Sequence, residues 1–90
     1  MMRREKDYLE AIYNITKEKD YARTTDIAYY LKIKPASATE MLQKLASRGF
    51  IDYKKYEGAT LTKDGYKIGK AVSERHSAIL KLLKMLQVPE

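Results

Sequence analysis

The chain has 90 residues, no cysteine and a formal net charge of +6 at pH 7. This length predicts a single domain over residues 1–90, and the lack of cysteine excludes a disulfide framework or a thiolate zinc site. No apolar run approaches the roughly 18 residues of a membrane span and no signal-peptide core follows the N-terminus, so we expect a soluble, cytoplasmic protein without a membrane partner.

The first predicted element is an amphipathic helix from about Arg4 to Lys17. Its apolar face repeats at helical spacing and comprises Leu9, Ile12, Tyr13 and Thr16. Asp7 and Glu10 stand three residues apart near its start, so their Cβ atoms share a helix face at a separation of roughly 5–6 Å. A polar connector at residues 17–20 ends the helix.

Two short helices joined by a tight turn are predicted between residues 24 and 49. Thr24 or Thr25 can cap the first, which runs to residue 31, because either hydroxyl accepts from a free N–H of the first turn. Pro35 suits the first position of the second helix, where its missing N–H would be unpaired anyway, and Gly49 ends that helix. This second helix, residues 35–48, is the expected reading helix, the element that would enter the DNA major groove.

A two-stranded hairpin, the wing, is expected at residues 50–62. Strand-forming residues at 50–53 and 59–61 flank a turn supplied by Glu57 and Gly58. Thr62 can then cap a last helix over about residues 63–87. The apolar stripe of this helix comprises Ile68, Val72, Ile79, Leu82, Leu83 and Leu86. His76 falls within the same spacing, which predicts an inward-looking imidazole. The order of elements predicts a mainly α fold with a small β-hairpin, a winged helix-turn-helix.

Basic side chains concentrate on the reading helix and the wing. Residues 32–55 hold six basic and two acidic side chains, whereas residues 1–31 hold six of each. Neutralisation of phosphates by such a patch supplies most of the non-specific affinity of DNA-binding proteins. For the later basic block at residues 63–84 we favour simple solvation of the helix. Enzyme activity is not expected, because the four glycines form no phosphate-binding loop and the single histidine has no nucleophile motif nearby.

The chain resembles a known family, the metal-dependent transcriptional repressors related to the diphtheria toxin repressor and the manganese transport regulator. The likeness covers almost the whole chain. It lies in the order and spacing of Asp7-Tyr8-Leu9-Glu10-Ala11-Ile12-Tyr13, Tyr21-Ala22-Arg23, Asp26-Ile27-Ala28, Ser37, Thr39, Met41-Leu42-Gln43-Lys44-Leu45, Tyr53-Lys54-Lys55-Tyr56, Leu61-Thr62, Gly65 and Arg75-His76. The family normally continues into a helical dimerisation domain, and Glu90 stands near the expected start of that domain.

The resemblance implies part of a divalent-metal site. The matching positions of the family coordinate metal through Asp7, Glu10 and His76, and the dimerisation domain adds further ligands. Two carboxylates and one imidazole suit Mn²⁺ or Fe²⁺, although intrinsic affinity rises toward copper. Without the resemblance, the plainer interpretation is that acidic residues favour a helix start and that a lone histidine on an apolar stripe is a packed core residue.

The resemblance also implies DNA contacts. The residues expected at base edges stand near the start of the reading helix and are Ala36, Ser37, Thr39 and Glu40. The candidates for phosphate contact are Thr25, Lys34, Lys44, Arg48, Lys54, Lys55 and Tyr56. Glu40 either accepts from a cytosine amino group or turns away from phosphate. By contrast, Ala38, Met41, Leu42 and Leu45 are expected to pack inward.

Together these patterns predict a sequence-specific, metal-responsive repressor of metal-uptake genes that binds a pseudo-palindromic operator as a homodimer, with residues 63–87 starting the dimerisation helix. One alternative is a winged-helix regulator without metal control and without the dimerisation domain. Another is a protein-interaction module that uses the apolar stripe between Ile79 and Leu86 and does not touch DNA. Salt-dependent binding to random duplex DNA separates the last from the first two.

Overall fold

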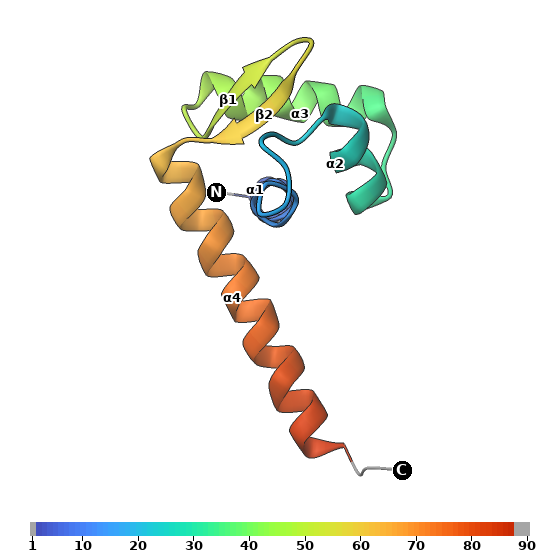
Figure 1. The fold of residues 1–90 in the computed structure, drawn as a ribbon, viewed down its shortest axis with the longest axis vertical. Coiled ribbons are helices and arrows are strands. Elements are labelled where there is room, and N and C mark those ends of the chain that lie inside the picture. Colours follow the sequence, from blue (N-terminus) through green and yellow to red (C-terminus); the bar gives the residue numbers. More distant parts are fainter. Residues whose placement is uncertain (1, 88–90) are drawn as a thin grey trace.

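The computed structural model describes residues 2–87. Its elements are, in order, α1 (Arg3–Ile15), α2 (Thr24–Leu31), α3 (Pro35–Ser47), β1 (Ile51–Lys54), β2 (Gly58–Leu61) and α4 (Lys63–Leu86). Figure 1 shows α1 nearly end-on, with α3 and the hairpin above it, α2 on its right and α4 running past its left side and downward. The order of elements is that of a winged helix-turn-helix, as the sequence predicts.

The core forms around α1. Its apolar face contacts α2, β2 and α4, and Leu9, Ala11 and Ile12 are completely buried. Tyr8 of α1 is also buried, and the other buried apolar residues come from the loop before α2, from α2, from α3 and from both strands: Ala22, Ile27, Ala28, Ala38, Leu42, Leu45, Ile51 and Ala59. The helix ends at Ile15, two residues earlier than predicted, because the Thr16 hydroxyl donates to the Ile12 carbonyl at 2.7 Å and closes the last turn.

The start of α2 differs from the prediction. Arg23 is the capping position, and the Asp26 carboxylate accepts from its backbone N–H at 3.1 Å. Thr24 and Thr25 therefore lie inside the first turn, and the Thr24 hydroxyl forms a hydrogen bond with the Tyr53 hydroxyl of the wing at 3.2 Å. The Asp26 carboxylate, at the third helical position, reaches back to the N–H of the capping residue as the acid of a capping box does, and this contact places the cap one residue before Thr24. Lys32, with φ 58°, turns the chain toward α3.

The predicted features of α3 are confirmed. Pro35 is its first residue, and Gly49 follows its end with φ 81°, a left-handed conformation that glycine adopts without a Cβ clash.

The wing turn also differs from the prediction. β1 and β2 pair antiparallel with Lys54 opposite Gly58, so the turn consists of residues 55–57 and Gly58 belongs to the strand. A Cβ on Gly58 would lie 2.5 Å from the Ala22 carbonyl oxygen, so the sequence has glycine here for a close approach. Ala22 and Ala59 exchange backbone hydrogen bonds of 2.9 and 2.8 Å, which ties the loop before α2 to the wing.

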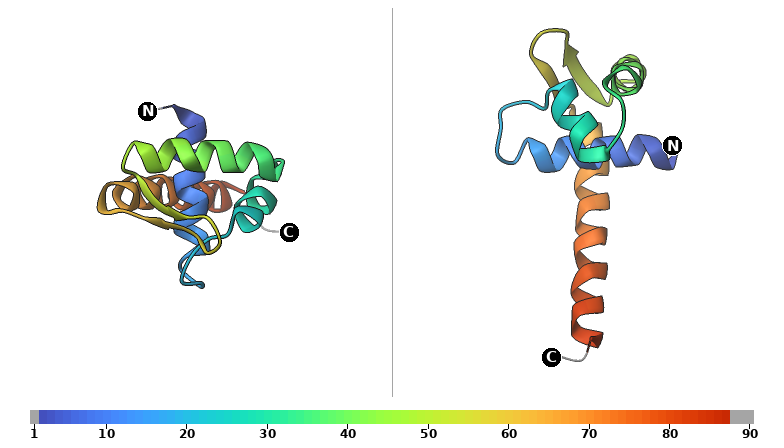
Figure 2. Two further views of the ribbon diagram at one scale, coloured as in Figure 1. Left: turned by 90° about the horizontal axis from the view of Figure 1, so that it is seen from above. Right: turned by 90° about the vertical axis from the view of Figure 1, so that its right-hand side faces the viewer.

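α4 begins as predicted, with the Thr62 hydroxyl accepting from the Gly65 N–H at 3.2 Å. It crosses α1 closely at Gly69 and then leaves the body of the protein, so every described residue from Glu74 to Gln87 is exposed. The right-hand view of Figure 2 shows this second half projecting away from the rest of the chain. Across residues 2–87, none of the helices combines the length and the apolar character that a membrane span requires.

Candidate nucleic-acid interface and metal ligands

The reading helix α3 has one buried and one exposed face. Ala38, Leu42 and Leu45 are fully buried against the core, as predicted, and Met41 is half-buried. The opposite side, which we call the outward face, comprises the exposed residues Ala36, Glu40, Gln43 and Ser47. Figures 1 and 2 show α3 and the hairpin together at the end of the molecule opposite the free half of α4. The outward face is therefore accessible to a large partner.

Gln43 is a candidate that the sequence-based selection omitted. It follows Ala36 and Glu40 at the spacing of one helix face, and it is exposed beside them. This spacing was readable in the sequence. A glutamine side chain can form two hydrogen bonds with the major-groove edge of adenine, so Gln43 belongs among the base-reading candidates.

Two predicted base readers lie beside the outward face. Ser37 is exposed and lines a shallow hollow between α3 and the start of α1, together with Arg4, Tyr8, Glu40, Met41 and Lys44. On the other side of α3, the Thr39 hydroxyl donates to the Pro35 carbonyl at 3.1 Å, so it retains only acceptor capacity and a methyl group. Glu40 forms no ion pair among residues 2–87, so its carboxylate is not held away from the outward face.

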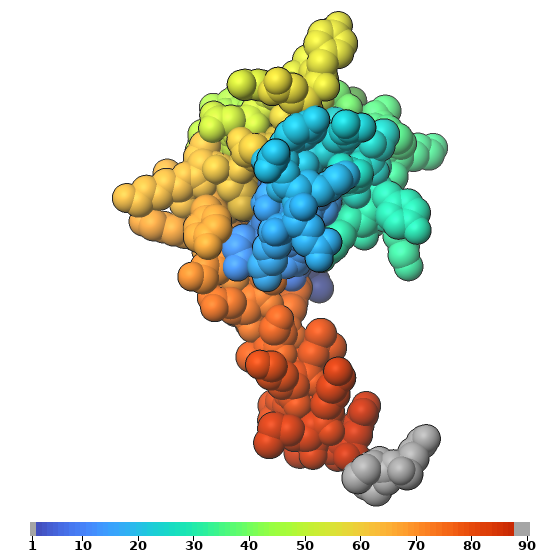
Figure 3. Space-filling view, viewed as in Figure 1, coloured from blue at the N-terminus to red at the C-terminus, as the bar shows by residue number. Residues whose placement is uncertain are grey.

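The wing presents its basic and aromatic residues at its tip. Lys54 and Lys55 are exposed, and Tyr56 is 91% exposed. Lys54 forms a loose, exposed ion pair with Glu57 at 3.7 Å, and the Lys55 ammonium lies over the Tyr56 ring. Figure 3 shows this tip projecting above the surface. Thr25 and Lys34, at the starts of α2 and α3, are also exposed.

Lys44 and Arg48 differ from the other phosphate candidates, because both reach toward a buried acid on α1. The Arg48 guanidinium donates to Glu5 at 2.5 Å, and the Lys44 ammonium lies 3.5 Å from the second Glu5 oxygen. Glu5 is only 1% exposed. Our reading of the sequence missed it, although it stands three and four residues before Tyr8 and Leu9 on the apolar face of α1.

The metal-ligand candidates converge only in part. The Glu10 carboxylate lies 2.8 Å from His76 Nδ1 across the α1–α4 crossing. Asp7 and His76 both line a hollow of about 340 Å³. Within residues 2–87, however, no group of three or more histidine or acidic side chains is arranged to hold a metal ion.

The predicted inward position of His76 is wrong. Its side chain is 52% exposed, whereas that of Glu10 is 13% exposed. Helical spacing indicated a stripe on α4 but not how far the body of the protein covers it, and α4 emerges from the body just before His76. The imidazole therefore lies at the edge of the α1–α4 contact.

Comparison with known proteins agrees with this architecture. Residues 1–59 match the family model described as the iron dependent repressor, N-terminal DNA binding domain. The HTH-type transcriptional regulators MntR of Lysinibacillus sphaericus (strain C3-41) and Bacillus subtilis (strain 168) are each 44% identical over 84 residues, which is 93% of this chain and 60% and 59% of those proteins. The chain thus spans about 60% of the length of these relatives.

A solved structure supports the fold. The Staphylococcus aureus MepR–DNA complex superposes with a TM-score of 0.71 over 98% of this chain and 66% of that one. At 16% sequence identity, this similarity concerns the winged helix-turn-helix fold alone. The family match covers well over half of the chain, and the chain therefore belongs to the iron-dependent repressor family, whose DNA-binding domain it contains.

Proposed function

We propose that this chain is the DNA-binding part of a metal-responsive transcriptional repressor of metal-uptake genes. The observation that carries this proposal is the exposed outward face of α3 beside a basic wing, at one end of a chain that belongs to a repressor family. Such a repressor acts on its operators in the cytoplasm.

In this proposal α3 enters the major groove. Base contacts come from Ala36, Ser37, Thr39, Glu40 and, in addition, Gln43. Lys34, Lys54, Lys55, Tyr56 and Thr25 contact phosphates and fix the position of the helix on the duplex. These residues are exposed or, in the case of Thr39, half-buried, so all can reach a ligand without rearrangement of the core.

The acidic and imidazole side chains at the α1–α4 crossing fit a divalent cation as an incomplete site. Glu10 and His76 are already 2.8 Å apart, and Asp7 borders the same hollow as His76. Asp7, Glu10 and His76 would hold Mn²⁺ or Fe²⁺, with the remaining coordination positions filled from elsewhere. The bound ion would supply a cross-link between α1, which supports the reading helix, and α4.

The free half of α4 supports a homodimer on a pseudo-palindromic operator. Its exposed apolar residues lie on the projecting end of the molecule and are Ile79, Leu80, Leu82, Leu83, Met85 and Leu86. A second copy of the helix would bury them, and two reading helices could then meet successive major grooves. The same exposed residues would also serve a protein-interaction module, so DNA binding must be tested directly.

The test is titration of a random-sequence duplex over a range of salt concentrations. Each phosphate contact lowers the slope of log K on log salt by about 0.9. Replacement of Lys54 and Lys55 together by Ala should therefore flatten the slope by roughly two units. Exposed lysines on α4, replaced together in Lys81→Ala/Lys84→Ala, serve as the control and should leave the slope unchanged. Absence of salt-dependent binding by the wild type would favour the interaction module.

Metal response is tested on the same proteins by their melting temperatures in manganese and in chelator. A cation that binds only the folded state stabilises it, so manganese should raise the melting temperature of the wild type. The rise should vanish in His76→Ala. It should also weaken in acid, because protons compete with the metal for its ligands. An equal rise in both proteins would remove His76 from the site.

A further inference from the structure

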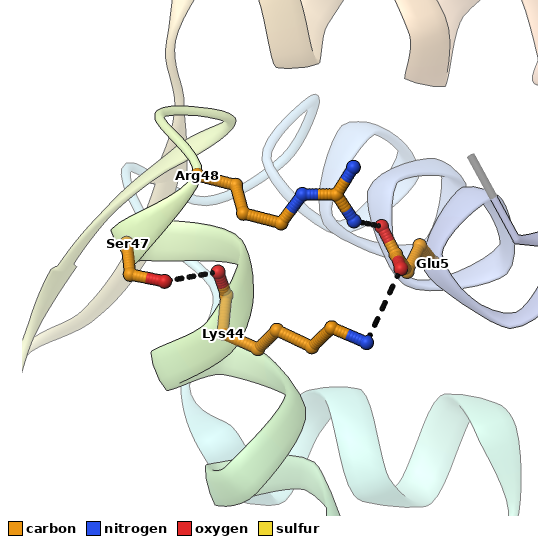
Figure 4. A network of polar contacts seen from close by, with 4 residues as sticks. All are labelled: Glu5, Lys44, Ser47 and Arg48. Carbon is orange, nitrogen blue, oxygen red and sulfur yellow. Dashed lines mark hydrogen bonds and ion pairs between the residues drawn. The ribbon is translucent and has the colours of Figure 1, made fainter.

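Glu5 is a buried charge that lies outside the proposed metal site. Its side chain is 1% exposed, near the start of α1. One oxygen accepts from the Arg48 guanidinium at 2.5 Å, and the other lies 3.5 Å from the Lys44 ammonium (Figure 4). The second oxygen has no hydrogen-bond partner among residues 2–87, so its contact with Lys44 is purely ionic.

Burial of a carboxylate costs free energy that an apolar side chain would not cost. Ion pairing offsets this cost, but a buried ion pair is often no more stabilising than well-packed apolar residues. The pair does constrain the relative position of its two side chains, because displacement of one partner leaves an uncompensated buried charge. The Glu5 contact therefore restrains the position of α3 more than it adds to stability.

The two basic partners stand one helical turn apart on the C-terminal half of α3. Lys44 is within the helix, and Arg48 is its C-terminal capping residue. Both side chains are only half-exposed, and in Figure 4 they extend sideways from α3 toward Glu5 on α1. The N-terminal half of α3, which holds most of the base-reading candidates, has no such ion pair among residues 2–87.

We propose that Glu5 is a positioning residue for DNA recognition, and that Arg48 contributes to recognition by pairing with Glu5. The pair clamps the C-terminal half of the reading helix onto α1, which sets the angle at which the outward face meets DNA. Arg48 is then not a phosphate contact, in contrast to the expectation from the sequence. This inference rests on the proposed DNA binding.

The first measurement is the salt dependence of binding to a random-sequence duplex. Arg48→Met alone leaves Glu5 without its closest partner and is expected to destabilise the fold, so the informative protein is Glu5→Met/Arg48→Met, in which both charges are removed. Its slope of log K on log salt should be no shallower than that of the wild type. Lys55→Met is the matched control, and its slope should be shallower by about 0.9. If the slope of the double variant is as shallow as that of Lys55→Met, the inference is overturned.

The second measurement is sequence discrimination. The probes are the random duplex and the duplex that the wild-type protein selects from a randomised pool. Glu5→Met and the double variant should each lose about tenfold in the ratio of the two affinities, which corresponds to misreading of roughly one base pair. The two losses should be equal, because both variants break the same contact. A ratio within twofold of wild type in the folded variants would show that Glu5 serves folding only, and would overturn the inference.

The wild type separates this inference from the proposed function. If the wild-type protein binds neither duplex at any salt concentration, the proposed function fails and the inference fails with it. If the wild type binds with a steep salt slope but the variants give the overturning results above, DNA binding stands and only the role of Glu5 is rejected.

Discussion

At the scale of single residues, one carboxylate organises the start of the helix-turn-helix. Asp26 accepts from the backbone N–H of Arg23 at 3.1 Å and from the Lys19 ammonium at 2.9 Å. These contacts cap α2 and tie it to the loop that follows α1. The Lys19 ammonium, followed by the Arg23 N–H, lowers the pKa of the Asp26 carboxyl below its ordinary value of 3.8.

The lowered pKa of Asp26 predicts a pH-dependent stability. A carboxyl with a lower pKa in the folded state stabilises the fold above its unfolded pKa, and this stability is lost as the pH falls through the folded value. Asp26→Asn should therefore reduce the free energy of unfolding by about 0.5–1 kcal/mol at pH 7 and by nothing at a pH well below 3. Urea denaturation at the two pH values measures this. Glu74→Gln, an exposed carboxylate on α4, is the control, and an equal effect of both substitutions would contradict the prediction.

Side-chain placement also ranks the base-reading candidates. Gln43 stands on the outward face and Ser37 beside it, so Ala at either position should cost about 1–3 kcal/mol on a selected operator and much less on random DNA. Thr39→Ala should cost less than either, because its hydroxyl proton already bonds to the Pro35 carbonyl. Binding isotherms on both duplexes test this order. Equal losses of binding free energy on the two DNAs would indicate that these residues contact the DNA backbone rather than bases.

At the scale of elements, the crossing of α1 and α4 depends on a glycine. A Cβ on Gly69 would lie 2.6 Å from the Leu9 carbonyl oxygen and 3.1 Å from Tyr13 Cβ. The two helix backbones therefore approach at a distance that no larger residue allows. Seven residues later His76 reaches Glu10, so the close crossing also places the proposed metal ligands.

Gly69→Ala should destabilise the fold, although glycine-to-alanine substitution in a helix normally stabilises it by up to about 1 kcal/mol. Overpacking against a backbone should reverse the sign and cost about 1–3 kcal/mol in the free energy of unfolding. Urea denaturation measures the change. Ser77→Ala, at an exposed position of the same helix, is the control and should be neutral or slightly stabilising. A stabilised Gly69→Ala protein would show that the helices do not cross this closely.

At the scale of the whole molecule, the projecting half of α4 dominates the shape, which extends 47 Å along its longest axis and 25 Å across. A polar chain links this helix to the reading apparatus. The Ser73 hydroxyl donates to the Asn14 side chain at 3.1 Å, and the Asn14 amide donates to the Tyr30 hydroxyl at 3.0 Å. These contacts join α4, α1 and α2 in one chain of hydrogen bonds.

The exposed apolar stripe of α4 predicts self-association. At micromolar concentrations the protein should sediment at about twice the chain mass of 10.5 kDa, because burial of roughly 25 cal/mol per Å² of apolar surface favours pairing of the stripes. Leu83→Glu should shift the equilibrium to monomer. Lys81→Glu, which adds the same side chain on the opposite side of the helix, should not. A monomeric wild type, or an equal response of both variants, would contradict the prediction.

Local sequence patterns were sufficient for the family, the order of elements and the buried face of α3. Pro35, Gly49 and Thr62 act through their own backbone geometry or through partners a few residues away, so their roles were readable along the chain. The partners of Glu5 and the exposure of His76 were not readable along the chain. Arg48 stands 43 residues from Glu5, and His76 stands 66 residues from Glu10, so both features depend on how α1 lies against α3 and α4. Only the tertiary structure places Lys44 and Arg48 beside the buried carboxylate of Glu5, because an ion pair forms between neighbours in space, whatever their separation in sequence.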